Sequence, residues 1–95
     1  MSKTDRAVSG SPAPEGLGEA GRALWRALTA GLELSRAEHA VVVEACRTAD
    51  AIARLDAVVA AEGVTVPGSR GQTVAHPALV EARQQRALLA SLLRR

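Results

Sequence analysis

The feature that most constrains the fold is an apolar pattern of constant spacing in the middle of the chain. The apolar positions follow one another in alternating steps of four and three residues: Val41, Ala45, Thr48, Ile52, Leu55 and Val59. This spacing is typical of a helix with one apolar seam, as in coiled coils. Ser35 and Glu38 have the spacing of a capping box, and Gly63 suits a helix end, so we predict a helix over residues 35–62.

The other face of this helix carries charges. Arg47, Asp50 and Arg54 are spaced i, i+3 and i+7, and we expect them to pair along an exposed face. Cys46, the single cysteine, lies within the helical pattern. We expect it to be a buried core residue, because an unpaired cysteine in a helix usually behaves as a small apolar side chain.

Two further helices and a hairpin complete the predicted fold, which is mainly α. A helical stripe indicates a helix over residues 16–30: Leu17, Gly21, Leu24 and Leu28, with Arg22, Arg26 and Thr29 on the other side. Two β-branched segments around a glycine-containing loop predict a β-hairpin over 64–75, and Pro77 suits the first residue of a helix over 77–95. Residues 1–14 have no apolar period and are expected to form a flexible arm before a single domain at 15–95.

The composition predicts a thin core. Of 95 residues, 20 are alanine, 22 are Leu, Val or Ile, and Trp25 is the single aromatic residue. Alanine contributes little apolar area, and a chain of this length is marginally stable even with larger side chains. We therefore expect a homo-oligomer. Its candidate contact residues are Trp25, Val41, Ile52, Leu55, Val59, Leu89 and Leu93. Trp25 alternatively fits the core of the monomer.

Charge is distributed unevenly along the chain. Residues 31–63 contain three cations and six acids, whereas residues 64–95 contain five cations and one acid. Eleven of the twelve cations are arginine, whose planar guanidinium suits phosphate and carboxylate partners. The candidate DNA-binding residues are Lys3, Arg6, Arg22, Arg26 and Arg70. Lys3 and Arg6 lie in the arm, where a plain disordered terminus is the alternative interpretation.

We find no constellation of residues typical of catalysis or metal binding. His39 and His76 are far apart in the sequence, and Cys46 has no second thiol, so a zinc site is not expected. The loop from Gly68 to Gln72 lacks the spacing and lysine of a phosphate-binding loop and is better explained as a turn. We predict a non-enzymatic protein without metal or cofactor. No signal peptide or membrane span is evident, so an intracellular protein is expected.

Several segments, in this order, resemble a known family. They are Pro14–Leu17 with Trp25 two turns later, the acidic helix start at Leu32–Glu38, Glu44–Asp50, the loop Gly68–Gln72, and His76–Pro77 followed by Glu81–Arg86 and a leucine-rich end. Together, over residues 14–95, they are similar to the small terminase subunit of tailed bacteriophages, in the form found in actinobacterial phages and prophages.

The resemblance implies a role in DNA packaging without catalysis. Such subunits form rings, bind viral double-stranded DNA, and engage the large terminase subunit, which carries the ATPase and nuclease. The implied location is the cytoplasm of the bacterial host cell, with no place in the mature virion. The alternative from the residues alone is a helical homo-oligomeric adaptor or regulator that uses the seam for a protein partner.

Overall fold

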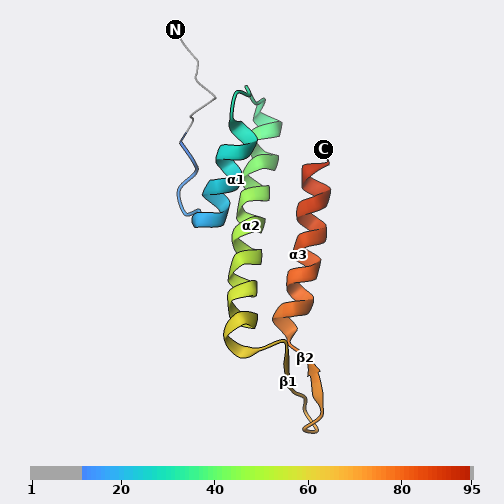
Figure 1. The fold of residues 1–95 in the computed structure, drawn as a ribbon. Coiled ribbons are helices and arrows are strands. Elements are labelled where there is room, and N and C mark those ends of the chain that lie inside the picture. The colour runs from blue at the N-terminus through green and yellow to red at the C-terminus, as the bar shows by residue number, and fades with distance from the viewer. Residues whose placement is uncertain (1–11, 95) are drawn as a thin grey trace.

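The computed structural model describes residues 12–94 and confirms the predicted mainly helical class. Within these residues the elements are α1 (Glu19–Thr29), α2 (Arg36–Glu62), β1 (Thr65–Pro67), β2 (Thr73–Ala75) and α3 (Pro77–Leu93). Figure 1 shows α2 in the middle, with α1 against its N-terminal half and α3 along its other side. The β-hairpin projects beyond the end of the helices, and the result is an elongated molecule of 64 × 23 × 16 Å.

The central helix α2 begins and ends where the sequence predicts. The Ser35 hydroxyl accepts the backbone N–H of Glu38 at 3.1 Å, and the Glu38 carboxylate accepts the N–H of Ser35 at 2.8 Å. These bonds satisfy two of the N–H groups that a helix start leaves without partners. At the other end Gly63 has a φ of +90°, a conformation that glycine adopts without strain. The capping box and the glycine stop are both confirmed.

Helix α1 is shorter than predicted. It begins at Glu19 rather than at residue 16, because Gly16 has a φ of +89° and the backbone of Gly18 is extended. Leu17 therefore precedes the helix, and its side chain is buried in the core. The prediction that Thr29 lies on the exposed face with the arginines is wrong. Thr29 is buried, and its hydroxyl donates to the carbonyl oxygen of Trp25 at 2.7 Å, which satisfies the polar group inside the protein.

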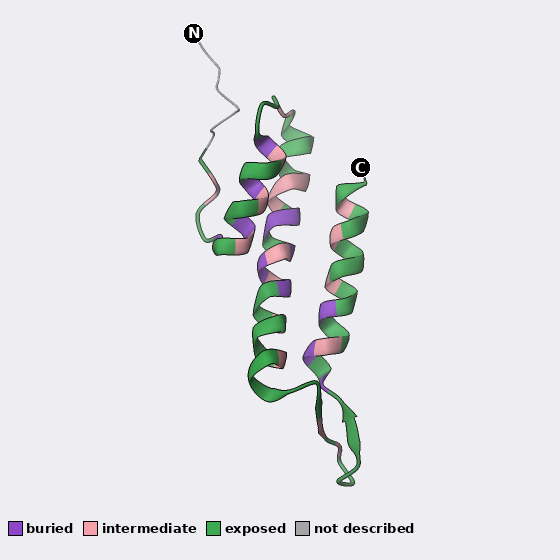
Figure 2. Ribbon diagram, in the orientation of Figure 1, coloured by how far each residue is buried: buried purple, intermediate pink, exposed green. Residues whose placement is uncertain are grey.

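A small core joins α1 to the first half of α2. Leu17, Trp25 and Cys46 form its buried cluster, and half-buried apolar residues pack around them: Ala13, Leu24, Val42 and Val43. Figure 2 shows the buried residues concentrated on α1 and the facing part of α2. Ala13 belongs to the segment predicted as a flexible arm, so the packed part of the chain begins before the predicted boundary at residue 15.

The apolar seam of α2 faces α3 of the same chain. Ala45, Thr48 and Ile52 of the seam are buried, although they lie outside the Trp25 cluster. Asp56 accepts a hydrogen bond from Arg86 at 2.6 Å, which joins α2 to α3 across the seam side. The seam therefore has a partner within the chain.

The hairpin pairs Thr65 with Ala75, Val66 with Val74 and Pro67 with Thr73 in antiparallel register. Its first strand begins one residue later than predicted. After the hairpin, His76 caps α3 by accepting the N–H of Ala78 at its Nδ1 atom, at 2.9 Å, and Pro77 is the first helical residue as predicted. The same ring contacts the Glu62 carboxylate through Nε2 at 2.7 Å, so His76 connects the end of α2 to the start of α3.

Candidate nucleic-acid interface

The two predicted DNA-binding arginines of α1 are exposed on one side of the helix. Arg22 and Arg26 are spaced i and i+4, so they lie one above the other on this side. Arg22 also donates a hydrogen bond to the carbonyl oxygen of Leu17, which holds its side chain along the start of the helix. Arg26 forms no ion pair within residues 12–94, and its guanidinium is free to take an anionic partner.

The position of α1 on α2 depends on two glycines and one carboxylate. Asp50 accepts the N–H of Gly18 at 2.7 Å and the N–H of Gly21 at 2.8 Å. Gly18 is the N-cap residue of α1 and has no side chain to cap the helix, so Asp50 of the neighbouring helix supplies the cap. Its negative charge also lies at the positive end of the α1 dipole.

The close approach of the two helices requires glycine at position 21. A Cβ atom there would lie 2.8 Å from the carbonyl oxygen of Cys46 and would overlap the Asp50 carboxylate. The prediction that Asp50 pairs with Arg47 and Arg54 on an exposed face is therefore wrong: Asp50 is buried and caps α1. The signal that sequence reasoning missed is the pair Gly18 and Gly21 at the start of a helix without its own capping side chain.

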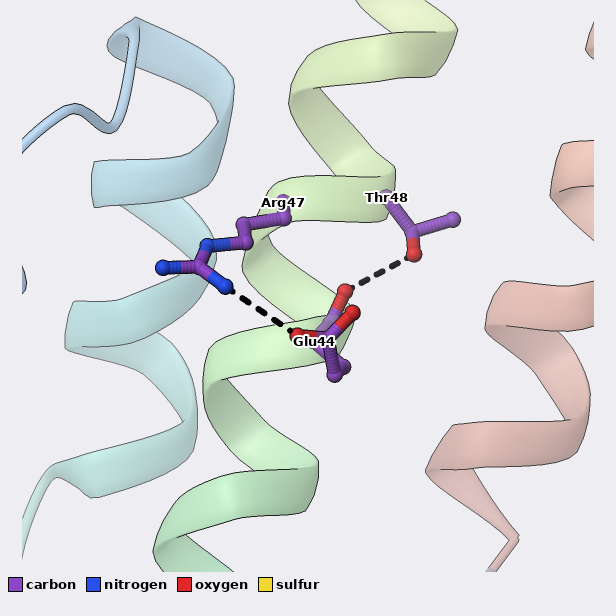
Figure 3. A network of polar contacts seen from close by, with 3 residues as sticks. All are labelled: Glu44, Arg47 and Thr48. Carbon is purple, nitrogen blue, oxygen red and sulfur yellow. Dashed lines mark hydrogen bonds and ion pairs between the residues drawn. The ribbon is translucent and has the colours of Figure 1, made fainter.

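This docking brings a third arginine beside those of α1. Gly21 lies against Cys46, and the next residues on the two helices are Arg22 and Arg47. The two helices run antiparallel. On each helix, the residue that follows the contact residue therefore points to the same side of the helix pair, so Arg22 and Arg47 share one side. Figure 3 shows Arg47 directed toward α1. We call Arg22, Arg26 and Arg47 the arginine face. Sequence reasoning missed Arg47 as a member because it was expected to pair along α2.

Two carboxylates accompany the arginine face: Glu19, three residues before Arg22 on the same side of α1, and Glu44 on α2. Glu44 contacts Arg47 at 3.2 Å, and both side chains are more than half exposed. The Thr48 hydroxyl donates to the Glu44 carbonyl oxygen at 2.7 Å, as Figure 3 also shows. An exposed pair of this kind contributes little to stability, so the Glu44 contact leaves Arg47 able to exchange partners.

The remaining predicted DNA-binding residues lie elsewhere. Arg70 is exposed at the tip of the β-hairpin, far along the molecule from the arginine face (Figure 1). Lys3 and Arg6 lie outside the described residues. The structure thus brings Arg22 and Arg26 together with Arg47 and separates them from Arg70.

The predicted oligomerisation residues fall into two groups. Trp25 and Ile52 are 2% and 8% exposed within the single chain, so neither side chain presents a surface to a second subunit in this conformation. The half-buried members are Val41, Leu55, Val59 and Leu89. Leu93 is 47% exposed and remains available for contact. Trp25 thus has the core position that was the alternative to an interface anchor.

An open apolar groove of about 370 Å³ lies where the α1–α2 turn meets the C-terminal end of α3. Leu28, Leu32, Leu34 and Val41 line one part of it, and Leu92 and Leu93 line another. Of these side chains, those of Leu32 and Leu93 are about half exposed. The groove is therefore an apolar surface that the chain leaves uncovered.

Cys46, His39 and His76 each contact other parts of the fold. Burial, with a smaller contribution in the same direction from the nearby Asp50 carboxylate, raises the pKa of the Cys46 thiol to about 11, so the thiol stays protonated near neutral pH. The His39 ring contacts the edge of Trp25 with a centroid distance of 5.4 Å. Among residues 12–94, no group of three or more His, Cys, Asp or Glu residues is arranged to hold a metal ion.

Comparison with protein-family models, with curated proteins and with solved structures gives no match for this chain. Among the described residues, no helix has both the length and the apolar character needed to cross a membrane.

Proposed function

We propose that this protein is a non-catalytic DNA-recognition component of phage DNA packaging, with the role of a small terminase subunit. The observation that carries the DNA-binding part is the arginine face. Arg22, Arg26 and Arg47 come from two helices and lie exposed on the same side of the α1–α2 pair. The packaging role rests on the family resemblance of residues 14–95.

The arginine face suits the phosphates of a duplex better than a single small anion. Its members follow one side of α1 over about one turn and continue onto α2, so the positive charge is spread over a surface rather than gathered in a pocket. Arginine contacts phosphate through two parallel N–H groups, and such contacts position a protein on DNA without reading its sequence. Glu44 would exchange its contact with Arg47 for solvent as phosphate binds.

The wider role requires partners. The protein would assemble with copies of itself, as a ring in the family it resembles, and present viral double-stranded DNA to the large subunit that carries the ATPase and nuclease. Exposed apolar side chains support association: Leu32, Leu88 and Leu93 are each about half exposed. The proposed location is the cytoplasm of the bacterial host cell, outside the mature virion.

The test of DNA binding measures fluorescence anisotropy of a labelled duplex over a range of salt concentrations. Binding to phosphates should weaken steeply with salt, and each lost phosphate contact should reduce the slope of log K against log salt by about 0.9. The variant R26A/R47A should therefore lower the slope by about 2. R26A/R83A is the matched control: it removes the same charge, but Arg83 lies on α3, away from the arginine face, so the slope should fall by about 1.

A helical adaptor is the second candidate, and the apolar groove favours it. This function predicts a defined complex with a protein partner and no salt-dependent affinity for DNA. If the wild-type protein binds no duplex at low salt, or if R26A/R47A and R26A/R83A have equal slopes, the DNA-binding proposal based on the arginine face is wrong. Light scattering measures self-association independently, and a monomer at micromolar concentration would contradict the ring.

A further inference from the structure

Among the helices and strands of residues 12–94, the β-hairpin packs least against the rest of the chain. Figure 1 shows it projecting beyond the helices, and Val64 just before β1 and Val74 in the middle of β2 are exposed. Two short strands are marginally stable by themselves, so a hairpin in this position is expected to act on a partner. Residues 63–80 contain no acid, and Arg70 is the single cation of arginine or lysine type among them.

The tip that carries Arg70 has a defined shape. Gly68 donates its N–H to the carbonyl oxygen of Gln72 at 2.6 Å, and Gly71 donates to the carbonyl oxygen of Gly68 at 3.0 Å. The Gln72 side chain folds back over the loop and accepts the N–H of Arg70 at 2.9 Å. A Cβ atom at Gly68 would overlap this amide, so a larger residue there would displace the Gln72 side chain.

This construction leaves Arg70 as the large side chain at the end of a narrow ribbon. Its neighbours at the tip are Gly68, Ser69 and Gly71, and its guanidinium has no ion-pair partner within residues 12–94. Gly71 has a φ of +82°, which turns the chain back immediately after Arg70. A broad phosphate-binding surface would need several cations. This hairpin presents one, at a position where the backbone is held by the Gln72 side chain.

We propose that the hairpin enters the major groove of duplex DNA and that Arg70 reads a guanine there. This inference rests on the proposed function and names the residue that confers base specificity. The major groove is about 12 Å wide and admits a two-stranded ribbon, whose strands lie about 4.8 Å apart. Thr65, Thr73 and Ala75, which share one face of the hairpin with Pro67, are small and exposed. The guanidinium fork matches the O6 and N7 acceptors of guanine.

The experiment selects bound duplexes from a pool with a randomised segment and sequences them, using wild type, R70A, R70K and the control R83A. Anisotropy then measures each protein against the selected duplex and against one with the guanine replaced. Wild type and R83A should select the same guanine. R70A should lose the preference for it by roughly 5- to 150-fold, the range for one bidentate arginine–guanine contact. R70K keeps the charge but lacks the fork, so it should bind DNA while losing most of this preference.

A further variant tests the bracing of the tip. Q72A keeps Arg70 and its charge but removes the side chain that accepts the Arg70 N–H. It should weaken the guanine preference while the salt dependence of binding to unselected DNA stays at the wild-type value. Circular dichroism should give the same helix content for each variant, because the hairpin lies outside the helical core.

The outcomes separate this inference from the proposed function. If the wild-type protein binds no DNA, both are wrong. If it binds DNA but R70A selects the same sequences with the same preference, or wild type selects no guanine, the assignment of Arg70 is wrong and DNA binding through the arginine face stands. If Val74→Thr dissociates an oligomer while R70A leaves DNA selection unchanged, the hairpin is a contact between copies of the chain, which also overturns the assignment.

Discussion

The two halves of this molecule use the same long helix in different ways. In the N-terminal half, α1 packs on the first half of α2 around Leu17, Trp25 and Cys46, and Asp50 caps the incoming helix. In the C-terminal half, α3 packs along α2 with Ala78 and Ala82 as its buried residues. Leu88 and Leu93 of α3 stay about half exposed.

The difference lies in where this alanine-rich chain buries its few large side chains. Trp25 and the close contact between Gly21 and Cys46 allow the N-terminal half to form a core within the single chain. The C-terminal half has leucines enough for a second core, but α3 turns part of them outward, where a further subunit or partner would cover them. We therefore expect stability of the single chain to depend mainly on the N-terminal half, and association to depend mainly on the C-terminal half.

The largest effect should come from Trp25→Ala. Trp25 is 2% exposed at the centre of the core cluster, and removing a buried aromatic side chain typically lowers the free energy of unfolding by about 3–5 kcal/mol. Chemical denaturation followed by circular dichroism measures the change. Leu88→Ala on the exposed face of α3 is the matched control and should change the unfolding free energy of the monomer by less than about 0.5 kcal/mol. Equal losses for the two variants would contradict the comparison of the halves.

A smaller decrease in the free energy of unfolding is expected for Asp50→Asn. The amide retains one neutral acceptor oxygen, so both N–H groups of Gly18 and Gly21 lose a charged partner and one of them faces an NH2 group that cannot accept. The loss should be about 1.5–3 kcal/mol, the range for hydrogen bonds to charged groups. Amide hydrogen exchange should increase most at the start of α1. Uniform exchange along α1 and α3 would show that Asp50 does not act as the cap of α1.

The smallest change in unfolding free energy near neutral pH is expected from the ionisation of Cys46. Because the folded state raises the thiol pKa from 9.0 to about 11, folding favours the protonated form. Its contribution is fully present below pH 9 and is lost as the pH rises from about 9 to about 11, by on the order of 2 kcal/mol. Unfolding of wild type and Cys46→Ala measured across this range should show the extra loss in wild type alone. Parallel pH profiles for both proteins would contradict the prediction.

Local patterns were sufficient for most of the elements. The capping box at Ser35 and Glu38, the glycine stop at Gly63, Pro77 at the start of α3 and the hairpin each depend on interactions between residues close in the sequence. Such signals act over a few residues, so they identify elements without knowledge of the tertiary contacts. The start of α1 differs from the prediction because Gly16 has a positive φ and because the N-cap Gly18 is held by Asp50 of α2 rather than by a capping side chain of its own.

The candidate interface was predictable only in part. Arg22 and Arg26 were identified from their exposure on one helix face and Arg70 from its place in a glycine-containing loop. Arg47 was not, because its proximity to Arg22 follows from the contact between Gly21 and Cys46, which are 25 residues apart in the chain. The seam was predicted as a contact between subunits, which stays a prediction; within the chain, α3 packs along α2.

By itself, therefore, the sequence determined the helices, the hairpin, the thin core and the excess of arginine, because each follows from composition or short-range spacing. The tertiary structure decided which faces meet. A helical period shows that a seam or a charged stripe exists but does not say what covers it. The choice between α3 and a second subunit for the seam, and between an exposed pair and a buried cap for Asp50, depends on long-range packing and on the need to satisfy the N–H groups of Gly18 and Gly21.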